Sequence, residues 1–356
     1  MLNYTIRRLI QAIPLLILIS IILFTILHFM PGGPLAPYMQ NPHITAADIA
    51  RLRHNFGLDR PTYPTILIDG KTPLHWVRNP ATHHGGHVAF FAGQYLSWLG
   101  KYISGDWGWS TMNSTPAKEA ILERLPATLE LMGASLVVAI FFGLIFGIVA
   151  AVKPYSVIDY FVTTFAFFGF SMPVFWFALM LQMLFAVQGI HLQAFGYAFD
   201  FNTPSAGMTS TEGGDFVDRL RHLILPVMTL SFLNLATWSR FMRASMQEVL
   251  HTEYMRTAAA KGLPFMRILF KHGFKNALMP VVTITALSLP ALFGGAIITE
   301  TIFAWPGMGR LFITALQQQD FSLLMAYLVL SAGLVVLFNL LADLAYGWLD
   351  PRVKYD

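Results

Sequence analysis

Three neighbouring histidines are the first residues of this sequence that could do chemistry. His83, His84 and His87 lie in the segment THHGGHV, and neutral imidazoles can bind transition metals. The adjacent glycines favour a flexible loop, and no carboxylate stands nearby in the sequence to complete a ligand set. We therefore expect solvated loop residues here and predict no metal site in this chain.

Motifs for nucleotide binding or covalent catalysis are missing from the sequence. Gly93, Gly100 and Lys101 superficially resemble a phosphate-binding loop, but their spacing is too long and Tyr102 stands where Ser or Thr is needed. The chain contains no HExxH, no GxSxG and no cysteine, and no nucleophile lies beside an obvious base. We predict that the chain is not an enzyme and binds no cofactor itself.

A few ionisable residues fall within or beside apolar stretches. A charge in mid-membrane is costly and usually functional, whereas charges near helix ends often pair or cap. Glu130 and Glu300 should lie near the outer ends of their helices, Asp343 near an inner end, and His28 near the outer end of the first. We therefore expect structural pairing or capping from the acids, and a packed or interfacial His28.

The composition indicates which elements must position these residues. Of 356 residues, 55% are hydrophobic and only 12% are charged, and the mean hydropathy is +0.57. A membrane-crossing helix needs about 20 mostly apolar residues. Six stretches qualify: 9–30, 127–152, 160–187, 223–246, 277–303 and 321–348. The first is too long for a cleaved signal sequence and lacks a cleavage site, so the sequence predicts an all-α integral membrane protein with six transmembrane helices.

Lysine and arginine in the short loops predict the orientation of these helices. With the N-terminus inside, twelve of them fall on inner segments, whereas the short outer loops carry only Arg219, Arg221 and Arg310. Both termini should therefore be cytoplasmic. The basic balance then reflects membrane topology, and without a basic stripe interleaved with aromatics we expect no nucleic-acid partner.

The polar segment 31–126 should form an external subdomain between the first two transmembrane helices. Thr45 is placed to cap a short helix ending near Gly57, TPAKEAILERLPATLEL predicts a second helix leading into the next transmembrane helix, and 62–91 resembles an insertion. The predicted organisation is 1–30 for the N-terminal end and first helix, 31–126 outside, 127–348 for the membrane core with a hairpin at 247–275, and 349–356 as an inner tail.

Two predicted transmembrane helices contain residues that disturb helical hydrogen bonding. Ser171-Met172-Pro173 interrupts the third, and Pro290 with Gly294-Gly295 interrupts the fifth. A kink or loosened turn is expected at both places, either as a point of movement or as an ordinary adjustment of packing.

The stretch EYMRTAAAKGLPFMRILFKHGFKNALMP, from 253 to 280, is unusually polar for this chain and lies on the predicted inner side. Val249, Leu250, Tyr254 and Ala258 recur at helical spacing, Gly262 can end that helix, and Pro264 can begin another. We interpret it as a helical hairpin whose slim alanine face and charges dock another protein. A basic loop resting on anionic lipid is the alternative, although it leaves the alanines and the glycine unexplained.

Segments spread along the sequence resemble one known family. They are YTIRRLIQAIPLL, HFMPGGP, NFGLDRP, GDWGWS, ERLPATLEL, FSMPVFWFALML, RTAAAKGL, HGFKNALMPVVT and TETIFAWPGMGRL. Nearly the whole chain resembles the inner-membrane permeases of ATP-binding-cassette importers, specifically the first permease of the dipeptide, oligopeptide and nickel class. The resemblance implies the type I importer permease fold, in which the loop before the fifth helix inserts into a cytoplasmic ATPase subunit.

The resemblance assigns this docking role to residues of the hairpin. They are Glu253, Tyr254, Arg256, Thr257, Ala258, Ala259, Lys261, Gly262 and Leu263. Arg256 departs from the general motif, which has Glu at that position, and matches the pattern of the peptide-importer branch instead.

The resemblance also implies a set of partners in the cell inner membrane. These are a homologous second permease, two cytoplasmic ATPase subunits that hold ATP and Mg²⁺, an external solute-binding protein, a peptide substrate and membrane lipid. Nickel or another small solute is an alternative cargo for the same class. An ion-coupled carrier acting alone and a membrane scaffold without transport are the alternatives outside it.

Two further groups of residues are candidates for contact with substrate and binding protein. Small or polar residues of the third to fifth helices are candidates for the translocation path, or else hydrogen-bond between helices: Ser171, Gln182, Ser231, Asn234, Thr285 and Ser288. Residues of the predicted outer loops are candidates to face the binding protein, or else anchor the chain at the lipid headgroups: Trp107, Trp109, Trp305 and Arg310.

Overall fold

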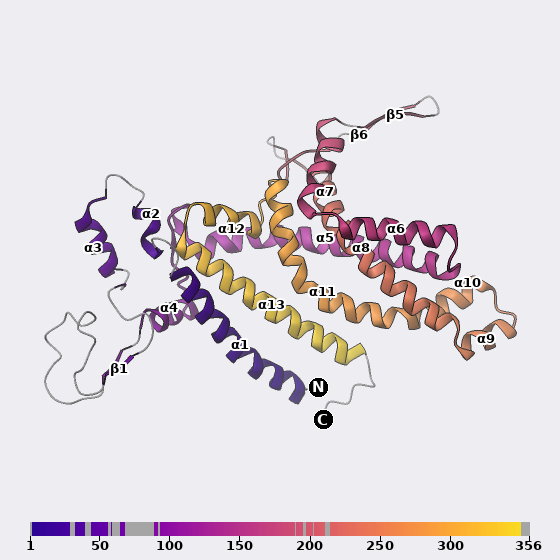
Figure 1. The fold of residues 1–356 in the computed structure, drawn as a ribbon, viewed down its shortest axis with the longest axis horizontal. Coiled ribbons are helices and arrows are strands. Elements are labelled where there is room, and N and C mark those ends of the chain that lie inside the picture. Colours follow the sequence, from indigo (N-terminus) through magenta and orange to yellow (C-terminus); the bar gives the residue numbers. More distant parts are fainter. Residues whose placement is uncertain are drawn as a thin grey trace. The chain divides into compact units, whose positions relative to one another are not determined.

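A computed structural model describes residues 2–28, 33–39, 44–55, 58, 65–67, 89–91, 93–188, 190–194, 197–201, 203–210 and 214–349 (Figure 1). The chain divides into two compact units. The first unit comprises Met1–Ala12, Arg124–Ile313 and Leu334–Asp356, and the second comprises Ile13–Glu123 and Thr314–Gly333. The histidines of THHGGHV lie outside the described residues.

Helices dominate the described residues, as the sequence predicts. The long ones are α1 (Leu2–His28), α5 (Ala117–Val152), α8 (Phe216–Leu250), α11 (Lys275–Ile302) and α13 (Phe321–Leu349). Within the described residues, four helical segments are long and apolar enough to cross a membrane: Thr5–His28, Ala117–Val152, Phe216–Leu250 and Phe321–Leu344. A bent pair of helices makes a possible fifth, so the chain is a multi-pass membrane protein.

The bent pair coincides with the predicted third transmembrane helix. α6 (Val157–Ser171) ends where Met172 adopts an extended conformation, and α7 (Val174–Leu181) begins after Pro173 and continues as the π-helix η3 (Gln182–Val187). The two parts meet at 103°. A residue before proline is sterically pushed out of the helical region, which explains the break. By contrast, α11 continues through Pro290 as one helix, and its path bends in Figure 1.

Within the first unit, α8 packs against α6, α7 and α11. Trp238, Met242 and Met246 of α8 are fully buried in one apolar cluster with small residues of α5 and α11. α5 approaches α8 so closely that a Cβ at Gly147 would lie 2.5 Å from the Met242 Cβ. Close backbone approach over small residues is a common way for membrane helices to pack, since it maximises van der Waals contact.

The second unit contains the predicted capped helix. After its part of α1, this unit contains η1 (Gly33–Leu35), α2 (Ala36–Met39), α3 (Ala46–Asn55) and α4 (Gln94–Ile103). The Asp48 amide donates to the Thr45 hydroxyl at 3.3 Å, and the Thr45 amide donates to the Asp48 carboxylate at 3.0 Å. The Thr45 hydroxyl also donates to that carboxylate, and these bonds hold the pKa of Asp48 below its ordinary value. The cap prediction is confirmed.

Short strands accompany the helices in this mostly helical chain. Three antiparallel pairs occur in the described residues: β1 (Thr65–Leu67) with β2 (Ala89–Phe91), β3 (Trp109–Ser110) with β4 (Thr115–Pro116), and β5 (Ile190–Ala194) with β6 (Tyr197–Phe201). β5 and β6 pair in the register Ile190↔Phe201 to Ala194↔Tyr197. The region expected as a loop after α11 also contains a helix, α12 (Met308–Gln317).

Candidate coupling hairpin and transport residues

The polar stretch folds as the predicted hairpin of short helices. α9 (Glu253–Ala260) is followed by α10 (Phe265–Arg267) and the π-helix η4 (Ile268–Phe274), which leads into α11. Gly262 ends α9 with a φ of +72°, a conformation that glycine adopts without steric cost. Pro264 stands directly before α10, where its missing N–H is not needed. Gly262 therefore ends the first short helix and Pro264 precedes the second, as predicted.

α9 begins later than the periodicity predicts. Val249 and Leu250 belong to α8, and the chain turns at His251 and Thr252 before α9 starts. The Thr252 hydroxyl donates to the Val249 carbonyl at 2.6 Å, so it satisfies an acceptor at the end of α8. The hairpin is thus joined to α8 through a turn and is not a continuation of that helix.

The hairpin has a small apolar core of its own. Met255, Ala258 and Ile268 are buried together, with Val249, Leu250 and Leu263 packed around them. Ala258 therefore faces inward, which corrects the expectation that the whole alanine run offers a docking face; Ala259 and Ala260 are exposed. This core fixes α9 against η4, since a Cβ at Gly273 would lie 3.2 Å from the Met255 methyl carbon.

The outer surface of the hairpin combines charges with an exposed apolar patch. Arg256 and Glu253 form an ion pair at 2.9 Å with each other. Phe265, Met266 and Phe270 are exposed by 54%, 65% and 52% of their surface, together with Tyr254 at 43%. We name these four residues the hairpin patch. Exposed apolar side chains on a short motif are typical of contact sites for another protein or for a membrane.

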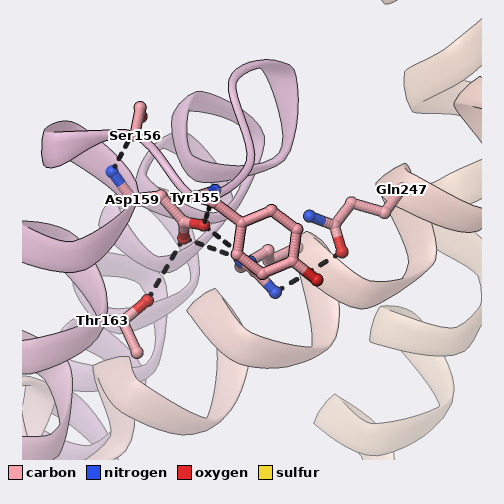
Figure 2. A network of polar contacts seen from close by, with 6 residues as sticks. Tyr155, Ser156, Asp159, Thr163 and Gln247 are labelled. Atoms are coloured by element: carbon pink, nitrogen blue, oxygen red, sulfur yellow. Dashed lines mark hydrogen bonds and ion pairs between the residues drawn. The ribbon is translucent and has the colours of Figure 1, made fainter.

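A buried polar network lies near the end of α8 that leads to the hairpin (Figure 2). Asp159 of α6 accepts two hydrogen bonds from the Arg243 guanidinium of α8, at 2.7 and 2.6 Å. It also accepts from the Tyr155 amide at 2.8 Å and the Thr163 hydroxyl at 3.3 Å. Bidentate guanidinium–carboxylate pairs are strong and geometrically specific. The network therefore fixes α6 to α8 just before the hairpin.

Sequence reasoning missed this pair. Ser156 caps α6 by accepting from the Asp159 amide, and Ser-x-x-Asp is a recognisable helix start. That local signal gives no hint of Arg243, which is 84 residues away in the sequence and had counted only as an inner-side charge. A cavity of about 350 Å³ lies beside the pair, between α6 and α8, and Arg240 also lines it.

Each of the six candidate path residues donates a hydrogen bond to a backbone carbonyl. Ser171, Asn234 and Ser288 bond to carbonyls of their own helices, as does the buried Ser231. Gln182 donates to the Ser205 carbonyl at 2.5 Å. Bonds within one helix neither link two helices nor define a shared path, so the role of these residues stays a prediction.

Thr285 is the one path candidate whose hydrogen bonds join two long helices within the described residues. Its hydroxyl accepts from the Trp238 indole at 2.8 Å, linking α11 to α8, and donates to the Val281 carbonyl of its own helix. Trp238 is fully buried, so this bond satisfies an indole N–H inside the first unit.

The four residues expected to face a binding protein differ in exposure. Trp305 is completely buried, and its indole donates to the Ala127 carbonyl at 2.8 Å, so that expectation is wrong for Trp305. Arg310 is exposed and donates to the Ala304 carbonyl. In the second unit, Trp109 is 59% exposed and Trp107 is partly buried.

Trp305 belongs to a structural clamp built by the segment TETIFAWPGMGRL. Glu300 is fully buried, and its carboxylate accepts from the Thr128 hydroxyl at 2.7 Å and from the amides of Gly309 and Arg310 at 2.7 and 3.1 Å. The Thr128 hydroxyl accepts in turn from the Met308 amide. The clamp secures the turn between α11 and α12 to α5.

The other acids also pair, as predicted. Glu130 accepts from the guanidinium of Arg219, with one contact at 2.9 Å. Asp343 lies 3.3 Å from Arg8. Among the described residues, no group of three His, Cys, Asp or Glu side chains is placed to hold a metal ion.

Comparison with known protein families identifies the family to which this chain belongs. Residues 143–355 match the model of the binding-protein-dependent transport system inner membrane component, and residues 1–67 match the N-terminal model of the same systems. The chain belongs to this family of transport permeases, which are not enzymes. Within the family it is a permease of the dipeptide and oligopeptide class of ATP-binding-cassette systems.

Relatives extend over the whole chain. It is 39% identical to the oligopeptide transport system permease protein AppB of Bacillus subtilis, over 99% of both chains. It is 35% identical to the dipeptide transport system permease protein DppB of Escherichia coli K12, over 100% of this chain and 99% of that protein. In fold it resembles a chain of the MetNI methionine ABC transporter in an inward-facing conformation, with a TM-score of 0.50 at 17% identity, covering 65% of this chain and 96% of that chain.

Proposed function

We propose that this chain is the first permease subunit of an ATP-driven, binding-protein-dependent importer of di- and oligopeptides. The observation that carries the substrate class is its full-length similarity, at 35–39% identity, to permeases named for oligopeptide and dipeptide transport. The chain forms half of the translocation path, and a homologous second permease forms the other half. Nickel remains the alternative cargo that uptake experiments must exclude.

The proposed topology has six transmembrane segments: α1, α5, the bent pair α6 and α7, α8, α11 and α13. Both termini are cytoplasmic in the inner membrane, residues 31–126 form an external subdomain, and 349–356 form an inner tail. Charge supports this orientation because arginine and lysine concentrate in and around the hairpin, which favours the cytoplasmic side for it.

The hairpin is the proposed contact with the cytoplasmic ATPase subunits, which hold the ATP and Mg²⁺. Its own core makes it a rigid body, and the exposed hairpin patch provides an apolar anchor within charged surroundings. Such anchors contribute most of the affinity of an interface when they enter a pocket on the partner. Nucleotide-driven movement of the ATPases would then reach α8 and α11 directly, because the hairpin connects these two helices.

Replacing Phe265 and Met266 together with serine tests this proposal. Purified complexes should lose the ATPase subunits but keep the second permease, and vesicles should lose ATP-driven dipeptide uptake. Ile103→Ser is the matched control, because Ile103 is 76% exposed but lies on α4 of the second unit. Uptake that needs only an ion gradient, or ATP-driven uptake of nickel without peptide, would refute the proposed function.

A further inference from the structure

A second cavity, of about 430 Å³, lies wholly within the second unit. Phe24 of α1, Trp98 and Lys101 of α4, and Phe321 of α13 contribute to its walls. The turn after α4 completes it with Asp106, Trp107 and Trp109. Its volume falls in the range of sites for small organic ligands, roughly 300–1,000 Å³.

The cavity presents Lys101 and two acids, Asp106 and Asp320, and in the described part of the chain Lys101 forms no ion pair with either acid. Lys101 lies in the last turn of α4, which ends in a left-handed Gly105 with the Asp106 amide bonded to the Lys101 carbonyl at 2.9 Å. This arrangement brings Lys101 and Asp106 to the same end of the helix. Both side chains are exposed, and within the described part of the chain neither forms an ion pair.

The carboxylate of Asp106 is held in place. Its Oδ1 accepts from the Gly108 amide at 3.0 Å, whereas Oδ2 accepts no hydrogen bond from the described residues. Asp320, the other acid of the cavity, is engaged: it accepts from the Ser110 hydroxyl and from the amides of Met112 and Leu323. Asp106 is therefore the acid available to a ligand.

The aromatic wall beside these charges is also fixed. Trp107 stacks on Tyr102 with ring centroids 5.0 Å apart and 10° between the planes. The Lys118 ammonium lies 5.9 Å from the Trp107 ring centre, and Trp98 packs on Tyr102 at 5.5 Å. Indole rings attract organic cations and give apolar contact area without much loss of side-chain entropy.

We propose that this cavity binds a short peptide with free termini, the peptide carboxylate meeting Lys101 and the ammonium meeting Asp106 beside the tryptophans. The inference rests on the proposed function for its choice of a peptide among zwitterions. A simple anion would also face Asp106, and a simple cation would also face Lys101, so a ligand with both charges fits best. The role is a holding site on the permease, separate from the path residues of the first unit.

Isothermal titration of the complete complex in nanodiscs without ATP tests the site. The probes are the dipeptide Ala-Phe, its N-acetylated form, its C-amidated form and glycerophosphoethanolamine. The variants are Lys101→Gln and Asp106→Asn, in which the new amide oxygen can still accept from Gly108. Lys153→Gln and Glu123→Gln are matched controls, because both residues are exposed and lie outside the cavity.

We expect each cavity variant to lose the preference for one free terminus of the dipeptide and to keep the preference for the other. Capping either terminus should weaken binding to the unmodified complex about ten-fold or more, since each cap removes a charge-assisted hydrogen bond. Lys101→Gln should abolish the preference for a free carboxylate and keep the preference for a free ammonium, while Asp106→Asn should do the reverse. The controls should keep both preferences.

Unchanged preferences in both variants would overturn the inference, and so would competition by glycerophosphoethanolamine equal to that of the dipeptide, which would indicate a lipid headgroup. ATP-driven peptide uptake by the same complex is measured in parallel. If the complex takes up peptide but the variants do not change its preferences, the cavity inference is refuted and the proposed function still stands. If the complex takes up no peptide, the proposed function itself is refuted.

Discussion

The ion pair between Arg243 and Asp159 predicts an unequal response to removal of its two members. The Asp159 side chain is only 4% exposed, whereas that of Arg243 is 27% exposed. Arg243→Gln leaves a nearly buried carboxylate without its cation. The Tyr155 backbone amide and the Thr163 hydroxyl still donate to it. Asp159→Asn leaves a guanidinium that water can reach, and the new amide oxygen can still accept from Tyr155.

Magnitudes follow from this difference in exposure. Removing one partner of a fully buried pair costs about 3–5 kcal/mol, because the other charge is left uncompensated. We expect about 3 kcal/mol for Arg243→Gln, at the low end because the pair is partly solvated. For Asp159→Asn we expect about 1 kcal/mol, the net value of a lost hydrogen bond. The double variant strands no charge and should cost about 1–2 kcal/mol, giving a coupling of about 2–3 kcal/mol.

Unfolding titrations in mixed micelles, followed by the helical circular-dichroism signal, would measure these differences. Arg240→Gln is the matched control: Arg240 lies one turn earlier on α8, is exposed, and forms no ion pair in the described part of the chain. It should change the free energy of unfolding by less than about 0.5 kcal/mol. The reasoning fails if Arg243→Gln costs no more than this control, or if the double variant equals the sum of the single ones.

Two further predictions concern the hairpin and the clamp. Gly262→Ala should destabilise the hairpin by about 1–2 kcal/mol, because a Cβ at positive φ crowds the following carbonyl. Hydrogen exchange of residues 253–263 should then become faster. The control is Gly133→Ala, where a Cβ meets open space, and it should leave that exchange unchanged. Glu300→Gln should cost about 2–3 kcal/mol in the same unfolding titration, because glutamine has one acceptor oxygen instead of two, so either the Thr128 hydroxyl or the Gly309 amide loses its acceptor. The exposed Glu119→Gln is its control, and an equal effect of both would contradict the clamp.

Local sequence determined which stretches became helices and where several of them begin or end. Long apolar stretches became α1, α5, α8 and α13, because length and apolarity alone decide whether a helix can cross a membrane. Gly262 and Pro264 stopped and restarted the hairpin, and Pro173 broke the third segment, because each acts through the backbone of its immediate neighbours. The strands β5 and β6 were missed, since short pairs give a weak signal within an apolar chain.

Tertiary structure alone decided which way side chains face and which distant residues meet. Ala258 is turned into the hairpin core because Ile268 packs against it, and Trp305 is buried because Ala127 of α5 accepts its indole N–H. Asp159 and Arg243 meet only because α6 packs on α8. A sequence specifies what each residue can bond to, but the partner is fixed by helix packing, which brings together positions that the chain separates by 84 residues or more.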